Sequence, residues 1–194
     1  MRYIQYLFFS VLSLLVIGAI IFGALIKSSL PKNNGELATS KISEEVLIYK
    51  DSWGIPHIKA QNKRDAIFAY GYTVAKDRLF QMDLQRRLSQ GKLSELLGDD
   101  LVEIDIMFRT YLFKNWAENY LSSSNLSEES LSYVNAFVEG VNHFVETGEK
   151  PFEYYLLNAN VESFSVVDVA SMTAYMAFTF MDGIRFDGLY TMLK

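Results

Sequence analysis

The sequence predicts a mostly α-helical fold with a short N-terminal β-hairpin, preceded by one transmembrane helix. Three observations carry this prediction. Residues 4–26 form an uncharged apolar run, residues 46–60 hold two short β-rich runs around a turn, and the remainder repeats apolar residues at intervals of three and four. The chain therefore divides into an anchor at residues 1–27, a linker at 28–45 and a folded region at 46–194.

Composition narrows the function classes. Half of the 194 residues are hydrophobic, which favours a packed core over disorder. The net charge is -5 and no run of five basic residues occurs, so we expect no nucleic-acid partner. The chain has no cysteine, which excludes disulfides, thiolate nucleophiles and cysteine-ligated metals.

The first element is the apolar run from Ile4 to Ile26. At a rise of about 1.5 Å per residue it is long enough to cross a hydrocarbon core of about 30 Å. A cleavable signal and a buried soluble helix are the alternatives. The apolar part of a signal is usually about 7–15 residues long, and no small-x-small cleavage site follows Ile26. We therefore expect an uncleaved anchor with the folded region on the extracytoplasmic side.

A polar stretch follows the anchor. It contains Pro31 and Gly35, which interrupt regular structure, and we expect a flexible tether. Two β-rich runs come next, separated by Gly54 and Pro56, and they predict the hairpin.

A long helix is expected from Asn62, its N-cap, to Gly91, with a short turn from Lys92 to Leu97 closed by Gly98. Its apolar stripe is broad, so the helix should be buried on more than one side. Asp83 and Arg87 lie four residues apart and can pair, or the charges can face water.

This central block, residues 46–98, resembles the start of the α chain of the penicillin acylase family of N-terminal-nucleophile hydrolases. Many positions match at fixed spacing over about fifty residues. They are Asp51, Gly54-Ile55-Pro56-His57-Ile58, Asp65-Ala66, Gly71-Tyr72, Ala75, Asp77-Arg78-Leu79, Gln81-Met82, Arg86-Arg87, Gly91, Leu93-Ser94-Glu95 and Gly98. His57 is interpreted as part of the hairpin frame and not as a catalytic base.

Three more helices are expected. One runs from Asp99 to Leu121. Asp105 and Arg109 lie four residues apart on it, either as a surface pair or in a special role, because the family's pattern also has an aspartate and an arginine here. The second begins at Ser127 and ends at Gly148, with His143 in a structural or solvated position. The third runs from Val166 to about Met181 and opens with a capping box of Ser165 and Asp168. It is almost wholly apolar but short for a membrane span, so we expect it to be buried in a larger protein.

The resemblance implies the α-chain part of an αββα fold whose catalytic serine opens a separate β chain. A free α-amine, with a pKa near 8, would take the serine proton. Backbone N–H groups and an asparagine amide would stabilise the oxyanion. No serine here has the β-chain context, and Ser124-Asn125 is interpreted as a loop. We therefore predict no catalytic residue in this chain.

Two substrate-binding residues are implied by the resemblance, Met176 and Phe180 on the last helix. In relatives that resemble penicillin G acylase an arginine precedes that phenylalanine, whereas here Thr179 does, which puts a phenylacetyl preference in doubt. Core packing is the alternative role. The family's calcium ligand falls on Phe186, near Asp182 and Asp187, so we predict no metal site in this chain, with calcium held mostly by the absent β chain.

Two functions remain open. The first is the α-chain portion of a membrane-anchored amidase for N-acyl compounds, either acylated β-lactams or acyl-homoserine lactones. It would work with a β chain from the same precursor or an adjacent gene. The alternative is a truncated, non-catalytic, membrane-tethered helical remnant or binding module.

Overall fold

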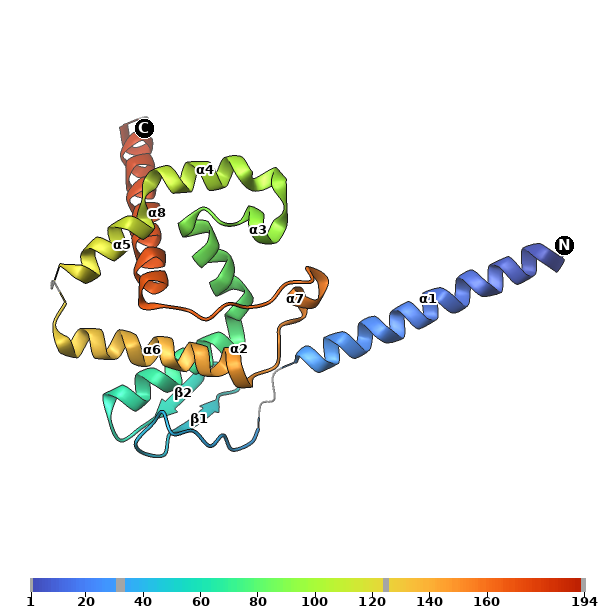
Figure 1. The fold of residues 1–194 in the computed structure, drawn as a ribbon, viewed down its shortest axis with the longest axis horizontal. Coiled ribbons are helices and arrows are strands. Elements are labelled where there is room, and N and C mark those ends of the chain that lie inside the picture. The colour runs from blue at the N-terminus through green and yellow to red at the C-terminus, as the bar shows by residue number, and fades with distance from the viewer. Residues whose placement is uncertain (1, 31–33, 124–125, 193–194) are drawn as a thin grey trace.

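A computed structural model describes residues 2–30, 34–123 and 126–192, with side chains described as far as residue 181. It shows a helical body with a two-stranded antiparallel sheet at one side (Figure 1), which agrees with the predicted class. The elements are α1 (Arg2–Ser29), β1 (Leu47–Lys50), β2 (Pro56–Lys59), α2 (Lys63–Gln90), α3 (Ser94–Leu97), a 3-10 turn (Asp99–Leu101), α4 (Val102–Tyr111), α5 (Phe113–Ser122), α6 (Glu128–Thr147), α7 (Phe152–Leu156) and α8 (Val166–Met192).

Helix α1 extends away from the body, and none of its residues is buried (Figure 1). Within the described residues it is the one helix that is long and apolar enough to cross a membrane, and a signal sequence would meet the same criterion. The predicted span 4–26 lies inside it, while membrane insertion stays a prediction. An edge-to-face contact between Phe22 and Phe152 joins α1 to α7.

The described part of the linker from residue 34 onward is irregular, as predicted, whereas residues 28 and 29 belong to α1, and the end of the linker is not a free tether. The Arg64 guanidinium donates to the Lys41 carbonyl at 2.8 Å. The buried Asp65 carboxylate accepts the N–H groups of Ser43 and Glu44, each at 3.0 Å. Burial opposes ionisation of Asp65, yet the hydrogen bonds from Asn62, Ser43 and Glu44 outweigh it and lower the pKa. These contacts fix residues 41–44 against the start of α2.

Helix α2 has the ends that its sequence predicts. The Asn62 side chain accepts from the Asp65 N–H, and Gly91 closes the helix in the left-handed conformation. The predicted continuous helix is nevertheless kinked, because Arg78 adopts φ -142° and ψ 19°. Neither proline nor glycine occupies the kink. It lies beside Asp77, which binds Lys50 of β1 at 2.6 Å.

The crossing of α2 and α6 is built on two glycines. A Cβ atom added to Gly71 would lie 2.1 Å from the Phe137 carbonyl oxygen. A Cβ atom added to Gly140 would lie 2.0 Å from the Phe68 carbonyl oxygen. The two backbones therefore touch at a distance that only glycine permits. The main core forms around this crossing from Ala75, Leu79, Met82, Val138, Val141, Phe144 and Phe164.

The prediction of one helix from Asp99 to Leu121 is wrong. The structure divides this segment into the 3-10 turn, α4 and α5. Leu112 separates α4 from α5 in the left-handed conformation, with φ 58°. Such a break usually carries glycine or asparagine, so nothing in the local sequence signals it. Packing of Phe108, Tyr111 and Phe113 against α8 accompanies the bend.

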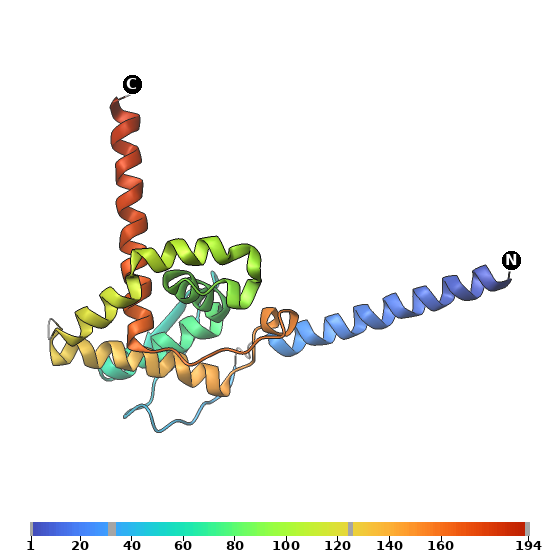
Figure 2. The ribbon, with the colours of Figure 1, turned by 45° about the horizontal axis from the view of Figure 1, so that its top comes forward.

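The predicted end of the last helix near Met181 is also wrong, because α8 continues to Met192. Gly183 lies just beyond the predicted end, but a single helical glycine costs only about 1 kcal/mol and does not end a helix by itself. The distal part of α8 projects beyond the body (Figure 2).

Candidate functional site

The predicted substrate-binding residues lie on an open face of α8. Met176 is 47% exposed and Phe180 is 71% exposed. On the other side of the helix, Tyr175 and Phe178 pack against the aromatic rings of α4 and α5, with Tyr111 and Phe178 ring centres 4.9 Å apart. The start of α8 also contacts α2 and α6, but around Met176 and Phe180 the described residues cover only the side of the helix that faces α4 and α5. Binding of an acyl group by Met176 and Phe180 stays a prediction.

The start of α8 is fixed by the predicted capping box. Asp168 N–H donates to the Ser165 hydroxyl at 3.2 Å, and the Asp168 carboxylate accepts the Ser165 N–H at 2.6 Å. The Gln90 side chain at the end of α2 donates to the other oxygen of Asp168. The capping box thus joins the start of α8 to the end of α2.

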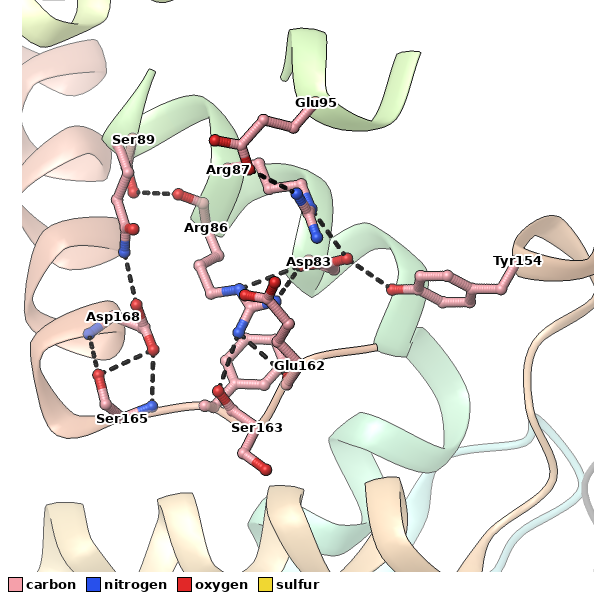
Figure 3. A network of polar contacts seen from close by, with 12 residues as sticks. Asp83, Arg86, Arg87, Ser89, Glu95, Tyr154, Glu162, Ser163, Ser165 and Asp168 are labelled. Carbon is pink, nitrogen blue, oxygen red and sulfur yellow. Dashed lines mark hydrogen bonds and ion pairs between the residues drawn. The ribbon is translucent and has the colours of Figure 1, made fainter. Parts of the chain in front are cut away.

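A buried polar network lies at the centre of the body (Figure 3). Asp83 is fully buried and accepts from Arg86 Nε at 3.0 Å, from Arg87 Nε at 3.2 Å and from the Tyr154 hydroxyl at 2.9 Å. The predicted pairing of Asp83 with Arg87 is confirmed. Arg86 and Tyr154 were not predicted to join it, although an aspartate followed by arginines at three and four residues was a usable signal.

The same network reaches the segment before α8. Arg86 donates to the carbonyls of Glu162 and Ser163 at 3.2 and 3.1 Å, and its guanidinium lies 4.2 Å from the centre of the Phe164 ring. Burial and the neighbouring Asp83 charge both raise the pKa of Tyr154, so its hydroxyl stays a proton donor. Every charge in the network has a fixed partner, so the network positions helices and offers no reactive group.

Asp105 and Arg109 do not form the expected surface pair. The Asp105 carboxylate is buried and accepts the N–H groups of Leu93 and Ser94 at 2.7 and 2.9 Å, while Arg109 Nε donates to the Gly91 carbonyl at 2.8 Å. Burial opposes the charge, but the Ser94 and Leu93 hydrogen bonds and the Arg109 charge lower the pKa of Asp105. Both side chains clamp the turn between α2 and α3, a long-range contact that spacing alone does not reveal.

Neither histidine is placed as a catalytic base. His57 Nε2 lies 3.0 Å from the Asp51 carboxylate, and its ring stacks on Tyr49 at 5.0 Å. The hydrogen bond from His57 is the main reason that the pKa of Asp51 is lowered. His57 therefore belongs to the hairpin frame, as predicted. His143 is half-buried beside Phe68 and Tyr72, and no described residue hydrogen-bonds to its Nε2.

Two cavities open beside the end of α2, the first between α2, α5 and the start of α8, and the second between α2, α4 and α5. Their volumes are about 290 and 330 Å³, and both are lined by Gln90, Lys92 and Lys114. The first also contacts Arg86, Arg87, Glu118, Glu162 and Asp168, so positive and negative charges are mixed on its wall. Met176 and Phe180 line neither cavity.

The metal and nucleophile predictions stay predictions. Within the described residues, no group of three histidine, aspartate or glutamate side chains could hold a metal ion. Phe186 offers no oxygen ligand, and the side chains of Asp182 and Asp187 lie outside the described part, so the residues described do not fit a calcium site. Ser124-Asn125 also lies outside the described residues.

Comparisons with known proteins agree on one family. The family model described as Penicillin amidase matches residues 45–192. Penicillin acylase 2 proenzyme of Pseudomonas sp. (strain SE83) is 38% identical over 138 residues, which cover 71% of this chain and 18% of that protein. Acyl-homoserine lactone acylase QuiP of Pseudomonas aeruginosa is 34% identical over 117 residues, which cover 60% of this chain and 14% of that protein.

A solved structure extends the comparison to the fold. The chain matches the thermostable penicillin G acylase from Alcaligenes faecalis with a TM-score of 0.64 and 28% sequence identity. The match covers 73% of this chain and 76% of that chain. This chain therefore spans less than a fifth of the length of the two curated relatives, but about three quarters of the solved chain.

Proposed function

This chain belongs to the penicillin amidase family, and we propose that it forms the α-chain part of an acylase that hydrolyses the amide bond of N-acyl compounds. The relatives' names point to two substrate classes, acylated β-lactams and acyl-homoserine lactones.

One observation carries the proposal. The solved relative is a chain of similar size to this one, whereas the curated relatives are several times longer, and one of them is a proenzyme. This difference supports a division of the enzyme into an α chain like this one and a second part. We call that second part the companion segment, meaning the portion of the relatives' length that this chain does not span.

The described residues support a division of labour. Asp83, Arg86, Arg87 and Tyr154 are mutually satisfied and buried, so they hold the scaffold. The open face with Met176 and Phe180 supplies apolar contacts to the acyl group. The companion segment supplies the serine nucleophile, whose proton passes to its own free α-amine, and the donors that stabilise the tetrahedral oxyanion.

The proposal includes the location. The helix α1 anchors the chain in a membrane, with residues 46–194 on the extracytoplasmic side. The length and exposure of α1 support this part of the proposal.

Co-expression with a companion segment tests the function. The probe is the remainder of the Pseudomonas sp. penicillin acylase 2 proenzyme, and the assay follows chromogenic phenylacetyl and fatty-acyl amides. We expect turnover from the pair. Phe180→Ala should raise KM more than it lowers kcat, because it removes contact with the unreacting acyl chain. The control Phe178→Ala removes a ring from the packed side of α8, and it should lower stability and leave KM unchanged.

A tethered, non-catalytic binding module is the second candidate. It is supported by the open apolar face of Met176 and Phe180, which can bind an apolar group without any catalytic residue. An assembled pair that binds acyl amides without turning them over would support this candidate against the first.

A further inference from the structure

The hairpin of β1 and β2 is poorly covered by the rest of the body. All four residues of β1 are exposed, and in β2 only Ile58 is half-buried. The outward side chains include Trp53 at the turn, which is 88% exposed. A two-stranded hairpin is marginally stable in water unless another layer or strand covers it.

One face of the hairpin already packs against α2. Lys50 binds Asp77 of α2 at 2.6 Å, and Ile58 on the same face is half-buried. The opposite face carries Leu47, Tyr49, His57 and Lys59, with the Lys59 ammonium 5.5 Å from the centre of the Tyr49 ring. This outer face has no helix of the described chain against it, and Leu47 and Tyr49 remain exposed.

The register of the hairpin shows which edge is open. The Asp51 N–H donates to the Ile55 carbonyl at 3.1 Å, and bonded pairs alternate along an antiparallel ladder. The backbone N–H and C=O groups of Leu47 and Tyr49 therefore point toward β2, where Lys59 and His57 lie opposite them. The same backbone groups of Ile48 and Lys50 point away from β2.

The two edges are not equivalent. On β2 the outward positions are Pro56, which has no N–H, and Ile58, beside α2. The β1 edge has no proline, and its one charged side chain, Lys50, is engaged by Asp77. Features that block the addition of a strand, such as a proline or a covering helix, are thus present at the β2 edge and missing at the β1 edge.

We propose that the free edge of β1 receives a β-strand of the companion segment through the backbone groups of Ile48 and Lys50. This inference rests on the proposed function, because the curated relatives extend far beyond the matched region and their additional length is the source of the strand. The added strand continues the sheet, and its side chains cover Leu47 and Tyr49 on the outer face.

Hydrogen exchange on the co-expressed pair tests the edge directly. The amide protons of Ile48 and Lys50 should exchange quickly in the chain alone and at least about tenfold more slowly in the pair. Ile48→Pro removes the outward donor while leaving the bonds to β2, and it should weaken assembly about tenfold or more. The matched control Ile48→Ala loses the same side chain but keeps the N–H, and it should assemble like the unaltered chain.

Three outcomes overturn the inference. If the pair assembles and turns over substrate while Ile48 and Lys50 exchange as fast as before, the strand does not add here, and the proposed function stands. If the chain does not assemble with the companion segment at all, both proposals fail. If the chain alone dimerises and Ile48→Pro abolishes the dimer, the β1 edge serves a second copy of this chain.

Discussion

The α2–α6 crossing differs from the hairpin and from α8 in how completely apolar side chains are covered and charges are paired. At the crossing, glycine backbones touch, the core is apolar, and the charges of Asp83, Arg86 and Arg87 are paired in the interior. At the hairpin and on α8, large apolar side chains such as Trp53 and Phe180 face outward. The difference indicates that the described residues satisfy the scaffold among themselves and leave apolar surface on the hairpin and on α8 uncovered.

The largest expected effect comes from breaking the polar network. Asp83→Ala leaves Arg86 and Arg87 buried without their shared carboxylate, and we expect a loss of about 3–5 kcal/mol in the free energy of unfolding. Denaturant unfolding measures it. Asp77→Ala is the control, because it removes a partly exposed pair with Lys50 and should cost at most about 1 kcal/mol. Equal losses in the two variants would show that the network does not hold the scaffold.

The next effect tests the glycine crossing. Gly140→Ala places a methyl group against the Phe68 carbonyl and should destabilise the chain by about 3 kcal/mol, the upper end of ordinary overpacking. Gly18→Ala in α1 is the matched control, because it adds the same methyl group at a position where no atom lies within 4 Å. Thermal unfolding of both variants in detergent should separate them, and a shared transition temperature would contradict the close approach of α2 and α6.

A pH series tests the turn clamp. The pKa of Asp105 is lowered in the folded chain, so its carboxylate stabilises the fold above about pH 4, the usual pKa of an aspartate. This contribution is lost as the pH falls through the folded-state pKa. Asp105→Asn should lose about 2 kcal/mol at pH 7. The difference from the unaltered chain should shrink in acid, and a constant difference from pH 7 to pH 2 would contradict the assignment.

The smallest effect on stability is expected on the open face. Phe180→Ser should change the free energy of unfolding by less than about 0.5 kcal/mol, because the ring is exposed. The same change should reduce self-association of the chain, which sedimentation measures. A large loss of stability would show that Phe180 packs inside this chain.

The sequence predicted the local features and missed the long-range ones. Helix ends at Asn62, Gly91 and Ser165 were readable because caps have local signatures. The left-handed Leu112 was not readable, because tertiary packing of aromatic residues, and not the residue type, stabilises that break. Asp105 was misjudged for a similar reason, since its partners Leu93 and Ser94 are brought near by the fold.

The candidate site was predictable only through family resemblance. Nothing in the apolar periodicity of α8 separates Met176 and Phe180 from Tyr175 and Phe178, because all four lie on one apolar helix. The structure separates them by packing, which places the second pair against α4 and α5 and leaves the first pair exposed.

We propose that this chain is a scaffold with a binding face and that the companion segment, not this chain, carries the nucleophile. Purified alone in detergent, the 194-residue chain should hydrolyse chromogenic phenylacetyl and fatty-acyl amides no faster than buffer. Addition of the co-expressed companion segment should produce turnover. Turnover by the chain alone, abolished by a substitution within it, would contradict the claim.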